Sequence, residues 1–352
     1  MADKKTVKRI ILAAVVVAVA GAIGYGAHIG NQSAGGGDAA KAQGDGLFPI
    51  KTWTRKDCGA TPFAVGVTQG FFKEEGLKLV FTGDTAAPQQ IPSVLNGDND
   101  VGGGFHPNNL AVAIAGGAKI KGVATAGIDP APEQDPKLRH MNWYINPKTT
   151  PDIKNFAGLN RLNGKLKFST ITNNICADFL GNKIADAQGL PRDKIEWVSM
   201  PDIQAVQALK QGLVTVAGVH PPFYKSMEDA GMVKIADSLD AKVGVAGGIG
   251  YYVFNHDFIA KHPDITRKFA RAIIKAQKWS NENPEQAQKI TEEWIGVPVN
   301  ATHYYAAGTE IDESLVIPWI EDLERSGVIP KGKVKPSDLV VSSSVNSTGS
   351  SK

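Results

Sequence analysis

Four short segments of the sequence place polar or sulfur-bearing side chains directly after a hydrophobic run and before a helix-like pattern. They are "TRKDCGAT" (54–61), "GFHPNN" (104–109), "STITNN" (169–174) and "GVHPPF" (218–223). At such a position the first N–H groups of the helix have no partner within the helix, and the helix dipole favours negative charge. All four segments therefore fit the chemistry of binding a small anion.

The first segment offers two candidate ligand-binding residues, Cys58 and Thr61. Thr61 either donates its hydroxyl to a ligand or caps the helix that Pro62 begins. Arg55 and Lys56 could attract an anion, but we expect both charges to be solvated.

The second segment ends a glycine-rich stretch, "GDNDVGGGFHPNN" (97–109), that nearly matches three known loop types. A calcium-binding EF-hand loop requires Glu where Asn109 stands, and a Walker A loop requires Lys where Gly103 stands. A dinucleotide-binding fingerprint requires Gly where Pro107 stands. What remains is a strand end followed by a helix start, at which His106 either donates to an anion or caps the helix. The candidate residues there are Phe105, His106 and Asn108.

The third and fourth segments supply the remaining candidates. Thr170, Thr172 and Asn173 are short hydrogen-bonding side chains before a helix, which suits an oxyanion without a formal cation. The alternative, in which Asn173 only caps the helix, explains one residue of this cluster. His220 and Phe223 are the candidates in the fourth segment, where a rigid Pro-Pro turn with an ordinary core Phe is the alternative.

The spacing of the cysteine and histidine residues in the sequence does not match a known catalytic or metal-binding motif. Cys58, His106, Cys176 and His220 lie on or beside these segments, so a metal site is conceivable, but no C-x-x-C or H-x-x-x-H spacing indicates one. Cys176 sits in a first helical turn, where the thiol pKa is lowered, yet we expect a buried packing residue. No G-x-S-x-G elbow occurs, and neither cysteine has an evident base. We predict no catalytic residue, no metal ligand and no cofactor.

Alternating strand and helix patterns connect the four segments. The alternation runs from about residue 50 to 125 and restarts after the Pro-rich stretch 129–136, between 166 and 236. A Gly-opened aromatic strand near 247–255 then leads into long helices. This pattern predicts an α/β fold of two lobes, the second inserted into the first. The two cysteines then belong to different lobes, so we do not expect a disulfide between them.

Composition agrees with a globular protein of about two domains. The chain has 352 residues, of which 42% are hydrophobic and 21% charged. The net charge is +3, and after residue 46 there are 33 basic against 32 acidic residues. A chain with nearly equal numbers of basic and acidic residues lacks the basic surface that nucleic acid binding requires, so we predict no nucleic acid partner.

The N-terminus carries the pattern of an export signal or membrane anchor. Four basic residues among the first nine precede an uncharged apolar run, Ile10–Ala27. The positive-inside rule places the rest of the chain outside the cytoplasm, in the periplasm or on the extracytoplasmic face of the membrane. Cleaved and uncleaved forms both remain open. We expect a polar linker over 31–46 and a disordered tail over 341–352.

Several longer motifs resemble one known group of proteins. They are "GFFKEEGLKLVF" (70–81), "VLNGDNDVGGGFHPNNLAVAIAGGAKIKGVA" (94–124), "QALKQGLVTVAGVHPPF" (207–223) and "NENPEQAQKITEEW" (281–294). In order and spacing they resemble the substrate-binding proteins of bacterial ABC importers. The most similar group is the nitrate, sulfonate and taurine family, which also contains thiamine-pyrimidine binders. The resemblance extends over about residues 50–339.

The resemblance implies a type II periplasmic-binding-protein fold, a two-lobed flytrap with a mostly parallel sheet in each lobe. Lobe 1 would comprise 47–142 plus 249–340, and lobe 2 would comprise 143–248. The implied function is to capture a small sulfonate-, taurine- or nitrate-like anion in the cleft and deliver it to the transmembrane subunits of an ABC permease. Three alternatives stay open: a binder of a pyrimidine or aromatic acid, a pyrimidine-synthase-like enzyme that consumes one of its own histidines, and a sensor ectodomain.

Overall fold

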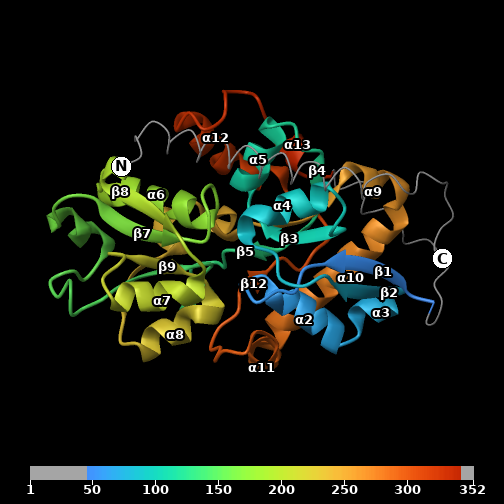
Figure 1. Ribbon diagram of the computed structural model, residues 1–352, viewed down its shortest axis with the longest axis horizontal. Coiled ribbons are helices and arrows are strands. Elements are labelled where there is room, and N and C mark those ends of the chain that lie inside the picture. The colour runs from blue at the N-terminus through green and yellow to red at the C-terminus, as the bar shows by residue number, and fades with distance from the viewer. Residues whose placement is uncertain (1–45, 342–352) are drawn as a thin grey trace, which may run out of the picture. The chain divides into compact units, whose positions relative to one another are not determined.

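The computed structural model describes residues 46–341, which form alternating strands and helices (Figure 1). The predicted signal or anchor segment with its linker (1–46) and the predicted C-terminal tail (341–352) lie outside the described residues, except for residues 46 and 341. Within 46–341, no helix combines the length and apolarity needed to cross a bilayer.

Lobe 1, as named here, contains two small sheets and the helices packed on them. Strands β1 (Phe48–Thr52) and β2 (Leu77–Phe81) pair in parallel. Strand β11 (Tyr251–Asn255) lies between β3 (Val101–Phe105) and β4 (Ile120–Thr125) and runs antiparallel to both. Because β11 follows the whole of the second lobe in the chain, lobe 1 is built from two separate stretches of sequence.

Helices and an aromatic core surround these strands. Phe63, Phe72, Tyr252 and Phe269 are fully or almost fully buried, and their rings contact one another at centroid distances of 5.7–6.5 Å. The helices of this lobe are α2 (Ala60–Thr68), α3 (Phe71–Glu74), α4 (Ala87–Leu95), α5 (Pro107–Ala115), α9 (His256–Lys261), α10 (Pro263–Glu282), α11 (Pro284–Ile295), α12 (Ile317–Arg325) and α13 (Pro336–Leu339).

Lobe 2 has the same kind of construction. Strand β6 (Asn142–Ile145) lies between β9 (Ala217–Val219) and β10 (Val233–Asp237), antiparallel to both, while β7 (Leu166–Thr170) pairs in parallel with β8 (Ile195–Ser199). Its α-helices are α6 (Cys176–Gln188), α7 (Asp202–Lys210) and α8 (Tyr224–Asp229). Figure 1 shows β7–β9 and α6–α8 on one side and β1–β4 on the other.

A short antiparallel pair, β5 (Gly127–Ile128) with β12 (Tyr304–Tyr305), lies between the two groups in Figure 1. Short 3₁₀ helices complete the described secondary structure: η1 (Pro136–Leu138), η2 (Phe156–Arg161), η3 (Arg192–Lys194), η4 (Pro221–Phe223), η5 (Ser238–Ala241), η6 (Gly244–Gly248) and η7 (Glu313–Val316). The residue limits that the sequence predicts for the lobes stay a prediction.

Side chains join the two lobes directly. Trp319 of α12 stacks on Phe179 of α6 with ring centroids 3.8 Å apart, and its indole Nε1 donates to the Ala246 carbonyl at 2.9 Å. The Asn108 amide donates across to the Ile175 carbonyl at 2.8 Å. Side chains from both lobes can therefore meet at one site.

The start of α6 differs from the sequence prediction by two residues. We predict a helix from Asn174, but the helix begins at Cys176 because Asn174 adopts a left-handed conformation with φ of 57°. The Asp178 carboxylate accepts hydrogen bonds from the backbone N–H groups of Asn174 (2.5 Å) and Ile175 (2.9 Å). This capping fixes the helix start and leaves Cys176 in its first turn.

Candidate functional site

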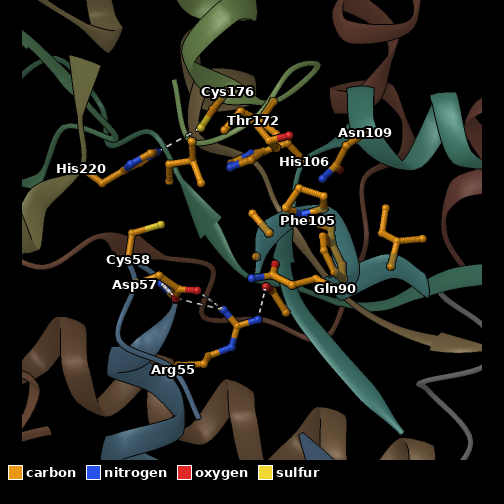
Figure 2. Close-up of a pocket in the computed structure, with 18 of the residues that line it drawn as sticks. Arg55, Asp57, Cys58, Gln90, Phe105, His106, Asn109, Thr172, Cys176 and His220 are labelled. Carbon is orange, nitrogen blue, oxygen red and sulfur yellow. Dashed lines mark hydrogen bonds and ion pairs between the residues drawn. The ribbon is translucent and has the colours of Figure 1, made fainter. Parts of the chain in front are cut away.

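A cavity of about 210 Å³ lies between the two lobes, and Figure 2 shows the side chains that line it. The helix starts of α2 and α5 and the end of β3 contribute from lobe 1. The β7–α6 connection and the end of β9 contribute from lobe 2. Six of the ten predicted ligand-binding residues line this pocket: Cys58, Phe105, His106, Thr172, Asn173 and His220.

The other four predicted residues are buried beside the pocket with partners of their own. Thr61 is the second residue of α2 rather than its cap, and its hydroxyl lies 2.7 Å from that of Thr291. Thr170 donates its hydroxyl to the Thr172 carbonyl at 2.7 Å, and Asn108 bridges to α6 as described above. Phe223 packs in a hydrophobic cluster of lobe 2.

Of the capping roles offered as alternatives, the one for Asn173 is wrong. His106 does stand at the N-cap position of α5, but its side chain makes no capping hydrogen bond; its Nδ1 lies 2.7 Å from the Ile249 carbonyl oxygen. Because a carbonyl only accepts, Nδ1 carries the proton and Nε2 is left free to act as an acceptor or ligand in the neutral ring. Asp178, not Asn173, supplies the side-chain cap of α6.

Arg55 was expected to be solvated, but it is only 2% exposed and lines the pocket. Its guanidinium donates to the Gly103 carbonyl at 2.5 Å and to Asp57 at 3.0 Å, and lies 4.5 Å from the centre of the Trp53 ring. Both terminal nitrogens are thus engaged by the protein. Among the residues described as lining the pocket it is the only Lys or Arg, so the pocket presents no uncommitted cationic side chain. Lys56 is exposed, as expected.

Cys176, His220 and Asp202 form a hydrogen-bonded line at one wall of the pocket (Figure 2 shows the first two). Cys176 Sγ lies 3.0 Å from His220 Nε2, and His220 Nδ1 lies 2.6 Å from Asp202 Oδ2. Burial alone would raise the pKa of the Cys176 thiol, but His106 and His220 outweigh it and lower this pKa to about 6. Burial disfavours the charged His220 ring, but nearby Cys58, Asp202 and Cys176 raise its pKa well above the ordinary value.

The two cysteines differ in environment. Both are free thiols. Burial raises the pKa of Cys58 to about 12, whereas Cys176 faces two imidazoles. In Figure 2, Cys176 and His220 point toward each other at one wall, and Cys58 lies on the segment that precedes α2. Cys176 is therefore the thiol with reactive or ligating character.

Two further histidines, which the sequence did not single out, complete a cluster behind this wall. His140 lies with its ring centroid 5.0 Å from that of His106, 4.6 Å from that of His303 and 5.3 Å from that of His220. A second cavity, of about 30 Å³, is lined by His106, His140 and His303. His106 borders both cavities and so connects them. No local pattern marks His140 or His303, because neither follows a strand end before a proline.

Comparison with known proteins places the chain in a family. The sequence profile of the NMT1-like family matches residues 56–295. The chain belongs to the NMT1-like family. No curated protein matches the sequence significantly.

Three of the solved structures that resemble this NMT1-like protein are ligand-binding proteins. A zinc-bound ligand-binding component of an ABC-type import system from Staphylococcus aureus aligns with 86% of this chain and 99% of its own, at 12% identity and a TM-score of 0.68. The nitrate-binding protein NrtA of Synechocystis PCC 6803 aligns over 85% and 87%, at 14% identity and 0.66. The aliphatic sulphonate-binding protein SsuA of Escherichia coli aligns over 84% and 92%, at 16% identity and 0.63.

These likenesses show the fold of the NMT1-like chain. It is the two-lobed periplasmic-binding-protein fold, which confirms the predicted fold class and the predicted resemblance. One enzyme, the desulfurization enzyme DszB, has a similar fold at 11% identity and a TM-score of 0.56. The fold therefore accommodates both binding and catalysis, and function must be argued from the site.

Proposed function

We propose that the chain is the extracytoplasmic solute-binding component of an ABC import system, with a small sulfonate-, taurine- or nitrate-like anion as its ligand. The observation that carries this proposal is the pocket between the lobes, whose walls include the starts of α5 and α6. Two features support it: nitrate and sulfonate binders share the fold, and this chain has an apolar N-terminal run. The implied partners are the transmembrane subunits of a permease.

The pocket supplies hydrogen bonds rather than a free side-chain cation. Thr172 and Asn173 from lobe 2 line the pocket together with Asn109 and His106 from lobe 1. The Asn109 side-chain oxygen is buried without a hydrogen-bond partner; because it only accepts, it would suit a donor on the ligand, such as the ammonium group of taurine. Neutral donors and helix starts can hold an oxyanion when water is excluded, because the dipoles are fixed and need no reorganisation.

Ligand binding would act through closure of the lobes. A ligand in this pocket touches residues of both lobes, such as His106 and Thr172, only when the lobes are together. Binding therefore stabilises the closed form over an open one. The closed form is then the species that a permease recognises.

A thermal-shift screen tests the ligand class. We expect millimolar taurine, an alkanesulfonate or nitrate to raise the melting temperature by the amount that mass action gives for a micromolar ligand. Thr172→Ala should weaken binding about tenfold, the loss of about one net hydrogen bond. Thr68→Ala, an exposed threonine on α2, is the matched control and should bind normally.

Three outcomes would change this assignment. Stabilisation by pyrimidines or aromatic acids alone would replace the anion with one of those ligands. Loss of mass from His106 during turnover would indicate the pyrimidine-synthase type of enzyme. An unchanged scattering radius and unchanged tryptophan fluorescence on ligand addition would contradict the closure mechanism.

A thiol-dependent enzyme is the second candidate, and the Cys176–His220–Asp202 line favours it. In such an enzyme the Cys176 thiolate attacks a carbonyl carbon and expels the leaving group. p-Nitrophenyl acetate tests this: an enzyme would be acetylated on Cys176, release p-nitrophenolate, and then turn over by hydrolysis. Stoichiometric acetylation without turnover, or no reaction, supports a binding protein. Cys176→Ser is the control.

A further inference from the structure

Three buried side chains at the junction of the two cavities offer nitrogen and sulfur ligands to a common point. We propose that His106, His140 and Cys176 bind a transition-metal ion of the zinc type, with His220 as the nearest additional donor. This metal site goes beyond the proposed function, because it requires no ligand in the pocket and concerns residues for which the spacing in the sequence predicted no metal.

The distances suit an ion held by three protein ligands, with a fourth position open, after a small contraction. One ligand atom from each of the three residues lies within 4.8 Å of the others, and His220 Nε2 lies 3.0 Å from Cys176 Sγ. Around tetrahedral zinc, with bonds of about 2.0–2.3 Å, such atoms would be about 3.3–3.8 Å apart. Side-chain rotations that move each ligand atom by about 1 Å therefore bring these donors to zinc-binding distances.

His140 is the observation that points most directly to a ligand. It is 2% exposed, and neither of its ring nitrogens has a hydrogen-bond partner. A buried polar group left without a partner is destabilising, so native structures rarely retain one unless something else satisfies it. A metal ion bound to one ring nitrogen would satisfy that group. The small cavity beside His140 is also lined by His303 and Tyr305, whose Nδ1 and hydroxyl likewise have no hydrogen-bond partner within the described residues.

The groups behind the proposed ligands orient them as in known metal sites. His106 donates its Nδ1 proton to the Ile249 carbonyl at 2.7 Å, which leaves Nε2 for a metal. The Asp202 carboxylate contacts His220 Nδ1 at 2.6 Å, which likewise leaves His220 Nε2 facing Cys176. Metal-bound histidines usually make such a bond from their other nitrogen to a carbonyl or carboxylate. The site is thus preorganised on two of its imidazoles.

The donor set defines the class of ion. Imidazole and thiolate donors favour zinc and other late transition ions, whereas magnesium and calcium require oxygen ligands. No carboxylate belongs to the three-residue group; Asp202 contacts His220 on the far side of its ring. We therefore expect Zn²⁺ to bind and Mg²⁺ not to bind.

Co²⁺ titration of the full chain, after metal removal with a chelator and with no sulfonate or nitrate present, tests the site. We expect one equivalent of Co²⁺ to give visible d–d bands and a near-ultraviolet thiolate-to-cobalt charge-transfer band, both displaced by Zn²⁺. Cys176→Ser should lose the charge-transfer band, and His140→Ala should weaken Co²⁺ binding at least tenfold. His256→Ala removes an exposed histidine as the matched control and should bind like the wild type. Circular dichroism verifies that each variant is folded, and His140→Gln replaces His140→Ala if the latter is not.

Any one of three results would overturn the proposal. The first is the absence of a thiolate-to-cobalt band in the folded wild-type protein at saturating Co²⁺. The second is a band that persists in Cys176→Ser and disappears in Cys58→Ser, and the third is Co²⁺ affinity that the His140 variants leave unchanged. Because the titration contains no anionic solute, its failure leaves the proposed solute-binding function untouched, and a failed solute screen leaves the metal site untouched.

Discussion

A charged cluster far from the pocket should control ligand affinity through closure of the lobes. The Asp322 carboxylate on α12 of lobe 1 contacts Arg192 at 2.8 Å and Lys183 at 3.7 Å, both of lobe 2. It also contacts Arg325 of its own helix at 2.8 Å, and Arg325 reaches Asp186 of lobe 2 at 2.8 Å. If the lobes separate when the protein opens, these cross-lobe pairs exist only in the closed form.

The expected effect of Asp322→Asn follows from its contacts. The Asp322 side chain is 9% exposed, and burial raises its pKa despite Arg192 and Lys183, so its pairs are worth no more than surface pairs of about 0.2–1 kcal/mol each. Losing two cross-lobe pairs should then disfavour closure by about 0.4–2 kcal/mol, which weakens ligand binding about 2- to 30-fold. Asp322 does not line the pocket, so no ligand contact is lost.

Isothermal titration calorimetry with the sulfonate or nitrate ligand found in the thermal-shift screen measures this effect. Glu75→Gln is the matched control, because Glu75 pairs with Arg271 at 2.6 Å within lobe 1. We expect it to change affinity less than twofold, and the Asp322→Asn effect to shrink as ionic strength rises. Unchanged affinity in Asp322→Asn, together with a normal fold, would refute the coupling of this cluster to closure.

Three further predictions concern stability. In Gly103→Ala the new Cβ would lie 2.5 Å from Tyr252 Cδ1 and 3.1 Å from Phe63 Cε2. Urea unfolding should therefore show a free energy of unfolding that is lower by about 1–3 kcal/mol. An unchanged urea midpoint would contradict this close packing. Thr61→Val removes a buried hydroxyl pair and should cost about 1 kcal/mol in unfolding free energy, while calorimetry should give unaltered ligand affinity because Thr61 lies outside the pocket. Burial raises the pKa of Asp100 above the ordinary value, so the folded state favours the protonated acid; its stabilising contribution should be complete below the ordinary pKa and decline as pH rises through the raised one. Asp100→Asn should remove that pH dependence, and parallel wild-type and variant stability curves across acidic pH would disprove it.

The sequence could predict those parts of the site that depend on local chain pattern. His106 and His220 each follow a strand end and precede a proline that begins a helix, and both line the pocket. In a doubly wound fold such ends meet at one edge, so the pattern alone indicates their neighbourhood. The α/β alternation predicts the fold class for the same reason: it depends on the spacing of strands and helices along the chain.

The remaining features depend on contacts between distant segments. Arg55 is buried because Asp57, the Gly103 carbonyl and the Trp53 ring surround its guanidinium, and one of these partners, the Gly103 carbonyl 48 residues away, is brought to it only by folding. His140 and His303 approach each other from positions 163 residues apart, with nothing local to mark either. The pattern of charge and hydropathy along the chain does not predict such contacts between distant residues.

The three candidate activities of this pocket make opposing demands on the charge of Cys176. A metal-free thiolate, which a nucleophilic role requires, pairs with the neighbouring His220 ring, whose pKa is raised, and so consumes the positive charge that this ring could offer an anionic solute. A divalent ion bound to the same sulfur cancels the thiolate charge and leaves a net positive centre next to Thr172 and Asn173. Metal binding at His106, His140 and Cys176 is therefore compatible with anion capture, because it adds positive charge to a wall where His220 is already paired with Asp202. A thiol-dependent enzyme competes with both, since a thiolate held by a metal ion is not free to attack.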